Sequence, residues 1–415
     1  MEIHEVKLGD IATVKGGKRL PKGINLITKP NTHPYIRVRD LNGKRTLELD
    51  SSFEFVDDET QKTISRYIVN EGDIVLSIVG TIGLVAVIGK SLNEANLTEN
   101  CVKLTSLSGV DRDFLYYFLK SSYGQQEITR GTVGAVQAKL PIKNIQDITI
   151  PLPDELTQRK IAAVLSSLDA KIETNKKIND NLQQQAQAIY SSMFSDNLDP
   201  AWSHGHLSDL IIVKYGKDHK KLADGIYPVY GSGGIMRYVE RPLYNKESVL
   251  IPRKGTLNNV MYVNQPFWSV DTMFYTEMKL PNVAKFVYHF VKAKDLASMN
   301  AGSAVPSMTT DILNAMEVVI PSASALEEFE SLIAPMYEAM KANDVQSQTL
   351  SKMRDTLLPK LMSGEIDVSA EMCIRDRTHR PFYFRWCQIQ FLNQLCLRME
   401  RQLLVLFSRQ YLQQR

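Results

Sequence analysis

The sequence predicts an α+β fold in which two pseudo-repeated domains are separated by two long helices that form an antiparallel coiled coil. An opening segment, KLGDIATVKGGK (residues 7–18), recurs in mid-chain as HLSDLIIVKYGK (residues 206–217). Strand-like runs bounded by Gly and Pro are mixed with short helical segments in both halves of the chain. Each half then ends in a stretch whose apolar residues are spaced by three and four, which is typical of helices.

The repeat extends through both halves of the chain. VLSIVGTIG (residues 75–83) aligns with LIPRKGTLN (residues 250–258), and IKNIQDITIPLP (142–153) aligns with ILNAMEVVIPSA (312–323). The offset between the copies falls from 199 at the first segment to 170 at the last. We therefore expect roughly thirty additional residues in the variable part of the first copy, accommodated in loops.

The two spacer segments share one heptad register. Apolar side chains recur from Ile161 and again from Phe329, at a constant offset of 168. Asn175 and Asn343 fall at the same seam position, where a buried Asn lowers stability but fixes the register. This favours pairing of the two helices over the alternative, in which each helix packs only on its own domain. The residues expected to pair the helices are Leu165, Leu168, Ile172, Asn175, Leu182, Ile189, Ile333, Met336, Met340, Asn343, Leu350 and Leu357.

The ends of these helices also carry sequence signals. Asp154 and Ser324 are the expected N-caps, and Glu327 follows Ser324 by three residues, as in a capping box. Pro335 is expected to kink the second helix or to mark its start. At 1.5 Å per residue each helix would be a rod of roughly 50 Å, able to hold two domains at a fixed separation. The expected boundaries are a first domain at 1–153, a spacer helix at 154–198, a second domain at 199–323, a second spacer helix at 324–368 and an atypical tail at 369–415.

The composition excludes several classes of protein. The chain has 415 residues, of which 44% are hydrophobic and 23% charged, so it can build two or more domains with ordinary cores. No apolar run is long enough to cross a bilayer, and the N-terminus lacks the features of a signal peptide. The four cysteines have neither zinc-site nor disulfide spacing, and His204 and His206 lack further ligands. We therefore expect a cytoplasmic protein without a metal site or a membrane partner.

Basic residues are concentrated where each copy begins. Residues 1–45 hold ten Lys and Arg against four acids, and residues 214–254 hold nine against four. The formal charge of the whole chain is only +3, and eight arginines against three acids in the last 45 residues account for that excess. A local basic cluster of this kind is typical of a surface that binds a polyanion.

No segment carries a complete catalytic motif. GLVAVIGKS (residues 83–91) has five residues between its glycines, whereas a phosphate-binding P-loop has four. DPAW (residues 199–202) lacks the second proline of a base-modifying methyltransferase loop, and no glycine-rich cofactor strand accompanies it. Asp271 with EMK (residues 277–279) has the residue types of a metal-dependent nuclease, but this combination is common by chance. We therefore expect no catalytic residue.

Four segments resemble parts of one protein family. IPLPDELTQRKIAAVLSSLDAKIETNKKIN (residues 150–179) and LLPKLMSGEI (357–366) resemble the two conserved helical regions of the specificity subunits of type I restriction-modification systems. YPVYGSGGI (residues 227–235) and PFWSVDTMF (266–274) are similar to segments of the target recognition domains of these subunits. The resemblance covers nearly all of residues 1–368, and its helical part is the more specific one.

This resemblance implies that the chain recognises DNA and performs no chemistry. Each target recognition domain would read one half of a split site in double-stranded DNA, and the paired helices would set the gap. Two methyltransferase subunits would clasp the helices, and restriction subunits would complete the complex. S-adenosylmethionine, ATP and Mg would be held by those partners and none by this subunit. Two alternatives stay open: a single-chain restriction-modification enzyme, and a structural adaptor that pairs helices without reading DNA.

Candidate contacts within the basic regions follow from side-chain chemistry. Lysine binds phosphates, arginine pairs with guanine through two hydrogen bonds, and glutamine pairs with adenine. For any single residue, a solvated surface charge is the simpler interpretation, so the cluster is a stronger prediction than its members. The expected phosphate contacts are Lys15, Lys18, Lys22, Lys214, Lys217, Lys220 and Lys221; the expected base contacts are Arg19, Arg37, Arg39, Arg253 and Gln137; Lys254 belongs to the same DNA-binding set.

The tail differs in composition from the rest of the chain. Beyond Glu371 there is no lysine or glycine, while arginine is abundant and three of the four cysteines occur. This abrupt change is typical of an out-of-frame or chimeric extension. The alternative is a basic amphipathic tail that binds nucleic acid or membrane.

Overall fold

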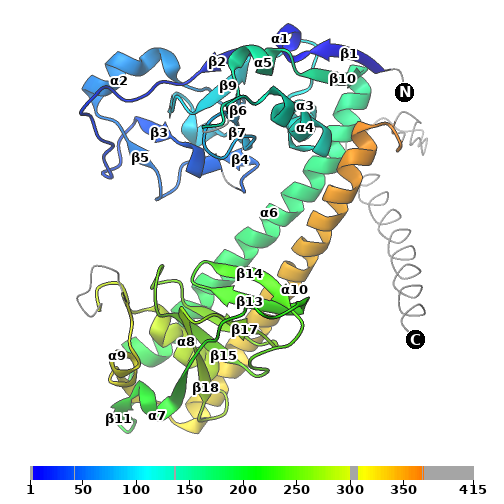
Figure 1. Cartoon of the computed structure of the whole chain (residues 1–415). Helices are drawn as coiled ribbons and strands as arrows, with labels where there is room; N and C mark the ends of the chain where they lie inside the picture. Colours follow the sequence, from blue (N-terminus) through cyan, green and yellow to red (C-terminus); the bar gives the residue numbers. More distant parts are fainter. Residues whose placement is uncertain (1–2, 42, 135–136, 300–306, 367, 369–415) are drawn as a thin grey trace, which may run out of the picture. The chain divides into compact units, whose positions relative to one another are not determined.

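The computed structural model divides the chain into two compact units (Figure 1). It describes residues 3–41, 43–134, 137–299, 307–366 and 368. The first unit joins residues 1–173 to residues 347–415, and the second unit is residues 174–346. Each unit contains one α+β domain and part of each long helix, so the helices do not form a unit of their own. Among the described residues, no helix is long and apolar enough to cross a membrane. The tail predicted at 369–415 lies outside the described residues.

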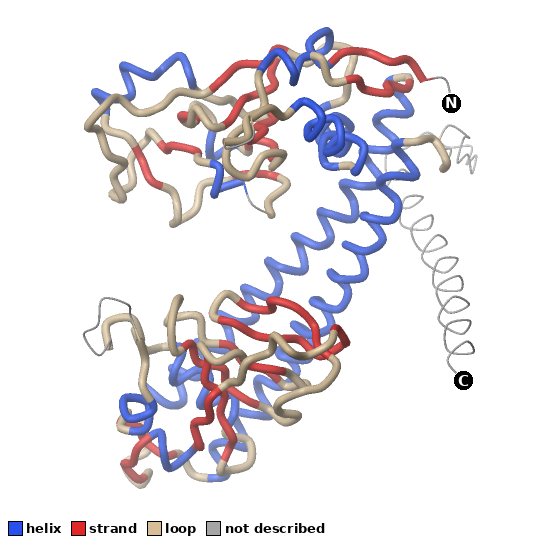
Figure 2. The backbone as a smooth tube through the Cα atoms, in the orientation of Figure 1, coloured by secondary structure: helices blue, strands red, loops and turns tan. Residues whose placement is uncertain are grey.

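The first domain contains three sheets with short helices between them (Figure 2). The sheets have the orders β2-β9-β6-β7-β4, β5-β3-β8 and β1-β10. The helix α3 begins where the Asp111 carboxylate accepts hydrogen bonds from the backbone N–H groups of residues 113 and 114. The elements are β1 Ile3–Lys7, α1 Leu8–Ile11, β2 Thr13–Gly16, β3 Pro34–Ile36, η1 Val38–Leu41, β4 Thr46–Leu47, β5 Glu54–Phe55, α2 Asp58–Ile64, η2 Ser65–Tyr67, β6 Ile74–Ser77, β7 Val85–Ile88, η3 Lys90–Leu92, β8 Asn96–Leu97, β9 Cys101–Thr105, α3 Arg112–Lys120, α4 Ser122–Gly131, α5 Ile142–Gln146 and β10 Thr149–Pro153.

The second domain repeats this plan with fewer elements. Its sheets have the orders β12-β18-β15-β16, β14-β13-β17 and β11-β19. In both domains the middle strand of the three-stranded sheet has one antiparallel and one parallel neighbour. The elements are β11 Ser203–His206, α7 Leu207–Leu210, β12 Ile211–Tyr215, β13 Asp224–Gly231, β14 Gly234–Val239, β15 Ser248–Pro252, β16 Met261–Val263, β17 Trp268–Ser269, β18 Met273–Met278, α8 Ala284–Lys292, α9 Thr310–Asn314 and β19 Glu317–Ile320.

Backbone hydrogen bonds confirm the first two alignments of the repeat. Lys18 N–H donates to the carbonyl of Leu97, and Lys217 N–H donates to the carbonyl of Ser269, both at 2.8 Å, which fixes the offset of 199. The N–H groups of residues 78 and 253 donate to the carbonyls of residues 100 and 272 at 2.8 and 2.9 Å, which fixes the offset of 175. The two domains therefore share a hydrogen-bonded frame as well as a similar sequence.

The third alignment was wrong by two residues. Leu8 N–H donates to the carbonyl of Ile148, and Leu207 N–H donates to the carbonyl of Met316, at 2.9 and 2.8 Å. The offset at these strands is therefore 168, the value found for the long helices, and not 170. A shift of two residues preserves the alternation of a strand between its two faces, so the hydrophobic pattern alone cannot detect it.

The extra residues of the first copy lie mainly between β3 and β6. Residues 36 and 230 occupy equivalent positions, since they accept the N–H of residues 98 and 270, both at 3.1 Å. Between these positions and the equivalent positions 78 and 253, the first domain has η1, β4, β5, α2 and η2 before β6, whereas the second domain has only β14 before β15. The strand β4 pairs with β7 and widens the larger sheet to five strands.

A glycine in the repeated segment allows two chain segments to approach closely in each domain. A Cβ atom on Gly17 would lie 2.1 Å from the carbonyl oxygen of Thr98, and one on Gly216 would lie 2.0 Å from that of Val270. These distances are far below van der Waals contact, so only glycine fits at either position. The recurrence of this glycine in the sequence therefore has a steric cause.

The predicted pair of long helices is confirmed. They are α6, Glu155–Ser191, which continues into a π-helical turn at Ser192–Asp196, and α10, Ala323–Met362. In the second unit the Asn175 amide donates to the carbonyl of Asn343 at 3.3 Å, and the Asn179 amide donates to that of Met340 at 3.1 Å. From residue 175 to residue 179 along α6, the partner on α10 changes from residue 343 to residue 340. The two helices therefore run in opposite directions, as predicted.

One of the two predicted N-caps is confirmed. The Asp154 carboxylate accepts the backbone N–H of Thr157 at 3.0 Å. Ser324 lies inside α10, and the hydroxyl of Ser322 instead accepts the N–H of Ala325 at 3.3 Å. The predicted cap at Ser324 was therefore wrong by two residues. Pro335 does not mark the start of α10, because the helix begins twelve residues earlier.

Asparagines form a polar layer between the helices. Asn175 has no exposed surface, and its amide also donates to Oε1 of Gln346 at 2.9 Å. Asn179 and Asn343 share a hydrogen bond of 2.8 Å, and the Asn179 amide reaches Oδ1 of Asp344 at 2.8 Å. Every predicted helix-pairing residue is buried or half-buried. The buried ones are Leu165, Leu168, Asn175, Ile333 and Leu357, and the half-buried ones are Ile172, Leu182, Ile189, Met336, Met340, Asn343 and Leu350.

Each domain is joined to both long helices by a chain of three polar side chains. In the first unit Tyr117 of α3 donates to Asp169 of α6, which also accepts from Arg354 of α10, both at 2.6 Å. In the second unit Tyr337 of α10 donates to Nε2 of the buried His289 of α8 at 2.9 Å.

The second chain continues from His289 to Gln187 of α6. Nδ1 of His289 lies 2.8 Å from Oε1 of Gln187, so Nδ1 carries the proton and the ring is neutral. Both helices therefore pack on the domains as well as on each other, so the predicted pairing is confirmed and the alternative, in which each helix packs only on its own domain, is wrong.

Acidification is expected to destabilise the second unit. Burial lowers the pKa of His289 from 6.5 to about 4, so the folded protein binds this proton less readily than the unfolded chain does. The free energy of unfolding should fall by up to about 3 kcal/mol as the pH drops from 6.5 to 4, since one pKa unit corresponds to about 1.4 kcal/mol. Urea unfolding followed by the fluorescence of Trp202 and Trp268 measures this change. An equally steep pH profile in His289→Gln would contradict the assignment.

The substitution Gly216→Ala is expected to destabilise the second domain by more than about 2 kcal/mol, because the new Cβ would clash with a backbone carbonyl that cannot rotate away. Gly233→Ala is the matched control. Nothing lies within 4 Å of a Cβ at that position, so the change should stay within about 0.5 kcal/mol. Equal unfolding midpoints of the two variants in urea would show that the close approach is not required.

Candidate nucleic-acid interface

Five loops of the first domain meet at one edge, which we call rim 1: residues 17–22, 37–41, 78–83, 98–100 and, of the fifth loop, the described residues 132–134 and 137–139. Backbone hydrogen bonds connect them. The N–H of Thr98 donates to the carbonyl of Ile36 at 3.1 Å, that of Ile78 to Asn100 at 2.8 Å, and that of Leu140 to Ile78 at 3.0 Å. Residues distant in sequence thereby share one surface.

The second domain forms an equivalent edge, rim 2, from residues 216–221, 231–234, 253–258 and 270–272. The N–H of Val270 donates to the carbonyl of Tyr230 at 3.1 Å, and that of Met308 to Arg253 at 2.9 Å. The stretch equivalent to 132–139 falls largely on residues 300–306, which lie outside the described residues.

The structure brings together eleven of the thirteen predicted DNA-binding residues. Lys15 and Lys214 instead lie on β2 and β12, the strands that lead to the rims, and Lys214 Nζ is 4.0 Å from the Glu277 carboxylate. Rim 1 carries Lys18, Arg19, Lys22, Arg37, Arg39 and Gln137, and rim 2 carries Lys217, Lys220, Lys221, Arg253 and Lys254. The basic residues that cluster in the sequence therefore lie on two sets of loops, one in each domain.

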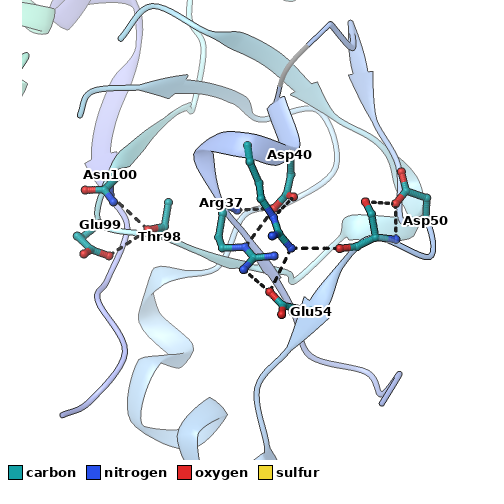
Figure 3. Close-up of polar contacts among 9 residues, drawn as sticks. Arg37, Asp40, Asp50, Glu54, Thr98, Glu99 and Asn100 are labelled. Carbon is teal, nitrogen blue, oxygen red and sulfur yellow. Dashed lines mark hydrogen bonds and ion pairs between the residues drawn. The ribbon is translucent and has the colours of Figure 1, made fainter. Parts of the chain in front are cut away.

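Arg37 and Arg39 belong to a carboxylate network within the first domain, and Figure 3 shows Arg37 next to Asp40 and Glu54. Arg37 forms an ion pair with Glu54, and its Nε lies 3.9 Å from Asp40. Arg39 Nη2 lies 3.1 Å from Glu54, and Arg39 Nε lies 3.5 Å from Asp40. Burial raises the pKa of Asp40 to about 6 against the opposing charge of Arg39. Arg37 is the more enclosed arginine, with 24% of its side chain exposed against 58% for Arg39, so Arg39 is the more accessible of the two predicted base contacts.

Arg19 is held differently, at the outer surface of rim 1. Its Nε donates to Oε1 of Glu99 at 2.7 Å, while 80% of the Arg19 side chain stays exposed. Glu99 also accepts the hydroxyl of Thr98 at 3.0 Å (Figure 3). Partial burial acts to raise the pKa of Glu99, but the hydrogen bonds from Arg19, from its own backbone N–H and from Thr98, together with the charge of Arg19, outweigh burial and hold the pKa below its ordinary value. Glu99 is therefore charged at neutral pH.

Arg253 lies at another position of rim 2, equivalent to Ile78 of rim 1. Its guanidinium lies 5.3 Å from the ring centroid of Tyr215, a cation–π contact, and Nη1 is 3.4 Å from the backbone oxygen of Asp271. The tyrosine ring limits the conformations of the Arg253 side chain, and the hydrogen bond to the loop backbone orients its guanidinium group. This is the kind of restriction that suits a side chain with a fixed donor geometry.

The sequence prediction missed the acidic and polar residues of the rims. Thr98, Glu99 and Asn100 precede β9, and their equivalents Asp271 and Thr272 precede β18. Aligning the strands β9 and β18 would have revealed that both copies place an acid at this point. The search for basic residues alone could not find them.

The structure does not support a nuclease site at Asp271. Asp271 precedes β18 on rim 2, whereas Glu277 is six residues further along this extended strand, about 20 Å away. Lys279 donates to the carbonyl of Ser208 at 2.6 Å. Within the described ranges, no group of three or more His, Cys, Asp or Glu side chains is arranged to hold a metal ion.

Comparisons with known proteins agree on one family. The family model described as type I restriction modification DNA specificity domain matches residues 2–184 and 201–334. The chain is 24% identical over 406 residues to the type I restriction enzyme MjaIX specificity subunit of Methanocaldococcus jannaschii, across 87% of this chain and 93% of that protein. It is 20% identical over 340 residues to the HindI specificity subunit of Haemophilus influenzae, across 55% of this chain and 71% of that protein.

A solved structure has a similar fold. The S subunit of a type I restriction-modification system from M. genitalium superposes with a TM-score of 0.54 at 20% sequence identity. The match covers 87% of this chain and 96% of that one. At this identity the comparison concerns the fold, and it agrees with the two repeated domains and the two long helices.

Neutralising single rim lysines is expected to weaken the binding of duplex DNA about equally for all sequences. Lys18→Gln and Lys217→Gln should each reduce the slope of log K against log salt concentration by about 1, because each removes one phosphate contact. Fluorescence anisotropy with labelled duplexes over a series of KCl concentrations measures this slope. Lys62→Gln on α2, exposed and outside the rim loops, is the control and should leave the slope unchanged. A slope equal to wild type in both rim variants would argue against phosphate contacts there.

Proposed function

This chain belongs to the family of type I restriction modification DNA specificity domains, and we propose that it is the DNA-reading subunit of a type I restriction-modification complex. Each domain would read one half of a two-part site in double-stranded DNA through its rim. The subunit would direct methyltransferase and restriction subunits to that site.

The observation that carries this proposal is the repeat of one backbone frame with different side chains at its edge. The same hydrogen bonds hold Lys18 beside Leu97 and Lys217 beside Ser269. On that common frame, rim 1 presents Arg19 and Arg39, and rim 2 presents Arg253. Two equivalent surfaces with different donors and acceptors suit two half-sites of different sequence.

The helix pair suits a role in setting the gap between the half-sites. α6 has 37 residues, which corresponds to about 55 Å of continuous helix. The buried asparagine layer opposes sliding of one helix along the other, because any other register would leave buried amide groups without partners. We infer that the register of this layer fixes the number of base pairs between the two halves.

Chemistry would be supplied by partners. We propose that two methyltransferase subunits bind the helix pair, that restriction subunits join the complex, and that S-adenosylmethionine, ATP and Mg are bound there and not by this chain. Residues 83–91, which do not have the spacing of a P-loop, include all of β7, a strand buried in the sheet, and this supports the view that nucleotide is bound elsewhere in the complex. We place the complex in the cytoplasm, with cellular DNA.

Co-expression with the methyltransferase encoded beside this chain tests the proposal, with methylated adenines mapped across the host DNA. We expect one motif made of two short parts separated by a fixed gap. Exchanging residues 200–322 for those of another family member should change one part and leave the other part and the gap intact. The swapped segment lies within the second unit, so the first should fold unchanged.

Other outcomes would favour the alternatives. Methylation or cleavage by the purified chain alone with S-adenosylmethionine or Mg would indicate a single-chain enzyme. A complex that forms but methylates without sequence preference would indicate a structural adaptor. A continuous motif would contradict the reading of one half by each domain.

A further inference from the structure

One corner of rim 1 holds an arginine in a fixed position. Arg19 Nε binds the carboxylate of Glu99 at 2.7 Å, so both terminal nitrogens of the guanidinium stay available to donate. The carboxylate is itself fixed by the Thr98 hydroxyl at 3.0 Å. Since 80% of the Arg19 side chain is exposed, its remaining donors are accessible to a ligand.

The backbone under this corner is fixed as well. The N–H of Gly17 donates to the carbonyl of Cys101 at 3.0 Å, and the N–H of Lys18 donates to that of Leu97 at 2.8 Å. The segment leading to Arg19 is thus hydrogen-bonded to the segment that carries Glu99. An arginine held at both backbone and side chain loses little conformational freedom on binding.

The equivalent corner of rim 2 carries two acids in place of the arginine–glutamate pair. The offset of 199 places Asp218 at the position of Arg19, and the bonds made by residues 270 and 272 place Asp271 at the position of Glu99. The Asp218 carboxylate accepts the N–H of Lys220 at 3.0 Å. Among the described residues, the structure shows no ion pair to the Asp271 carboxylate. The corner therefore offers acceptors in the second domain where the first offers donors.

We propose that this corner contacts a base edge in each half-site: Arg19, positioned by Glu99, reads guanine in the first half-site, and Asp271 accepts from the amino group of cytosine in the second. The inference rests on the proposed function and adds the bases that are read, which the proposed function does not specify. Guanine presents two acceptors in the major groove, which match the two terminal nitrogens of Arg19. Cytosine presents a donor there, which matches a carboxylate.

The carboxylates argue against phosphate contacts at this corner. A phosphate bound to Arg19 would lie close to the charged Glu99, and one placed at the second corner would meet the carboxylates of Asp218 and Asp271, beside which Arg253 Nη1 lies 3.4 Å from the backbone oxygen of Asp271. Like charges at such short distances repel, whereas the edge of a base is neutral. Acids on an otherwise basic rim are therefore better suited to bases than to the DNA backbone.

The test is methylation mapping with the complex of this chain and its methyltransferase. Arg19→Ala should abolish the preference for guanine at one position of the first half-site, a loss of roughly 10- to 100-fold in discrimination. Arg19→Lys should not restore it, since lysine lacks the paired donors. Glu99→Gln should retain guanine but weaken the preference, because the arginine is less firmly held. Asp271→Asn should relax a cytosine in the second half-site alone.

Arg66→Ala is the matched control, since Arg66 is exposed and lies in η2 outside the rim loops; it should leave every position of the motif unchanged. The proposal is overturned if Arg19→Ala lowers methylation equally at all sites and reduces the salt dependence of binding by one phosphate contact. It is also overturned if the same guanine is still required. Failure of the proposed function is a separate result: the wild-type complex would then show no two-part motif.

Discussion

The hydrophobic core of each unit is completed by the two long helices, and this shared burial constrains everything else in the structure. In the first unit Leu165 and Leu168 of α6 and Leu361 of α10 join the core of the domain. In the second unit Tyr190 of α6 and Phe329 of α10 do so. One helix must therefore fit a domain and its partner helix at the same time. Removing apolar surface from water supplies the stability of this arrangement, but it does not by itself define the register.

Polar groups determine the register of the helices, which the burial of apolar surface leaves undefined. The asparagine layer between α6 and α10 satisfies its amides in one register. The chains from Tyr117 to Arg354 and from Tyr337 to Gln187 anchor each domain to both helices. The first chain is ionic and the second is neutral, although Tyr117 and His289 occupy corresponding positions on their helices. Each chain thus connects its domain to α6 and α10, but the two chains use different side-chain chemistry.

The rims combine a fixed frame with variable side chains. Gly17 and Gly216 allow the close approach that joins the first loop of each rim to the segment before the last long strand. This steric requirement explains why the glycine recurs while the residue two positions later changes from Arg19 to Asp218. A frame that tolerates a reversal of charge at its edge can change what it binds without refolding.

The sequence by itself determined the repeat, the α+β class, the two helices and their shared asparagine position, because these depend on local periodicity and on residues that only one geometry accepts. It misplaced the last strands by two residues, since the alternation of a strand fits both registers, and it placed the second cap two residues too late. It could not show that Glu99 holds Arg19, or that Arg37 is enclosed with Glu54 and Asp40. Only the tertiary structure decided which charges face solvent, because those contacts join residues far apart in the chain.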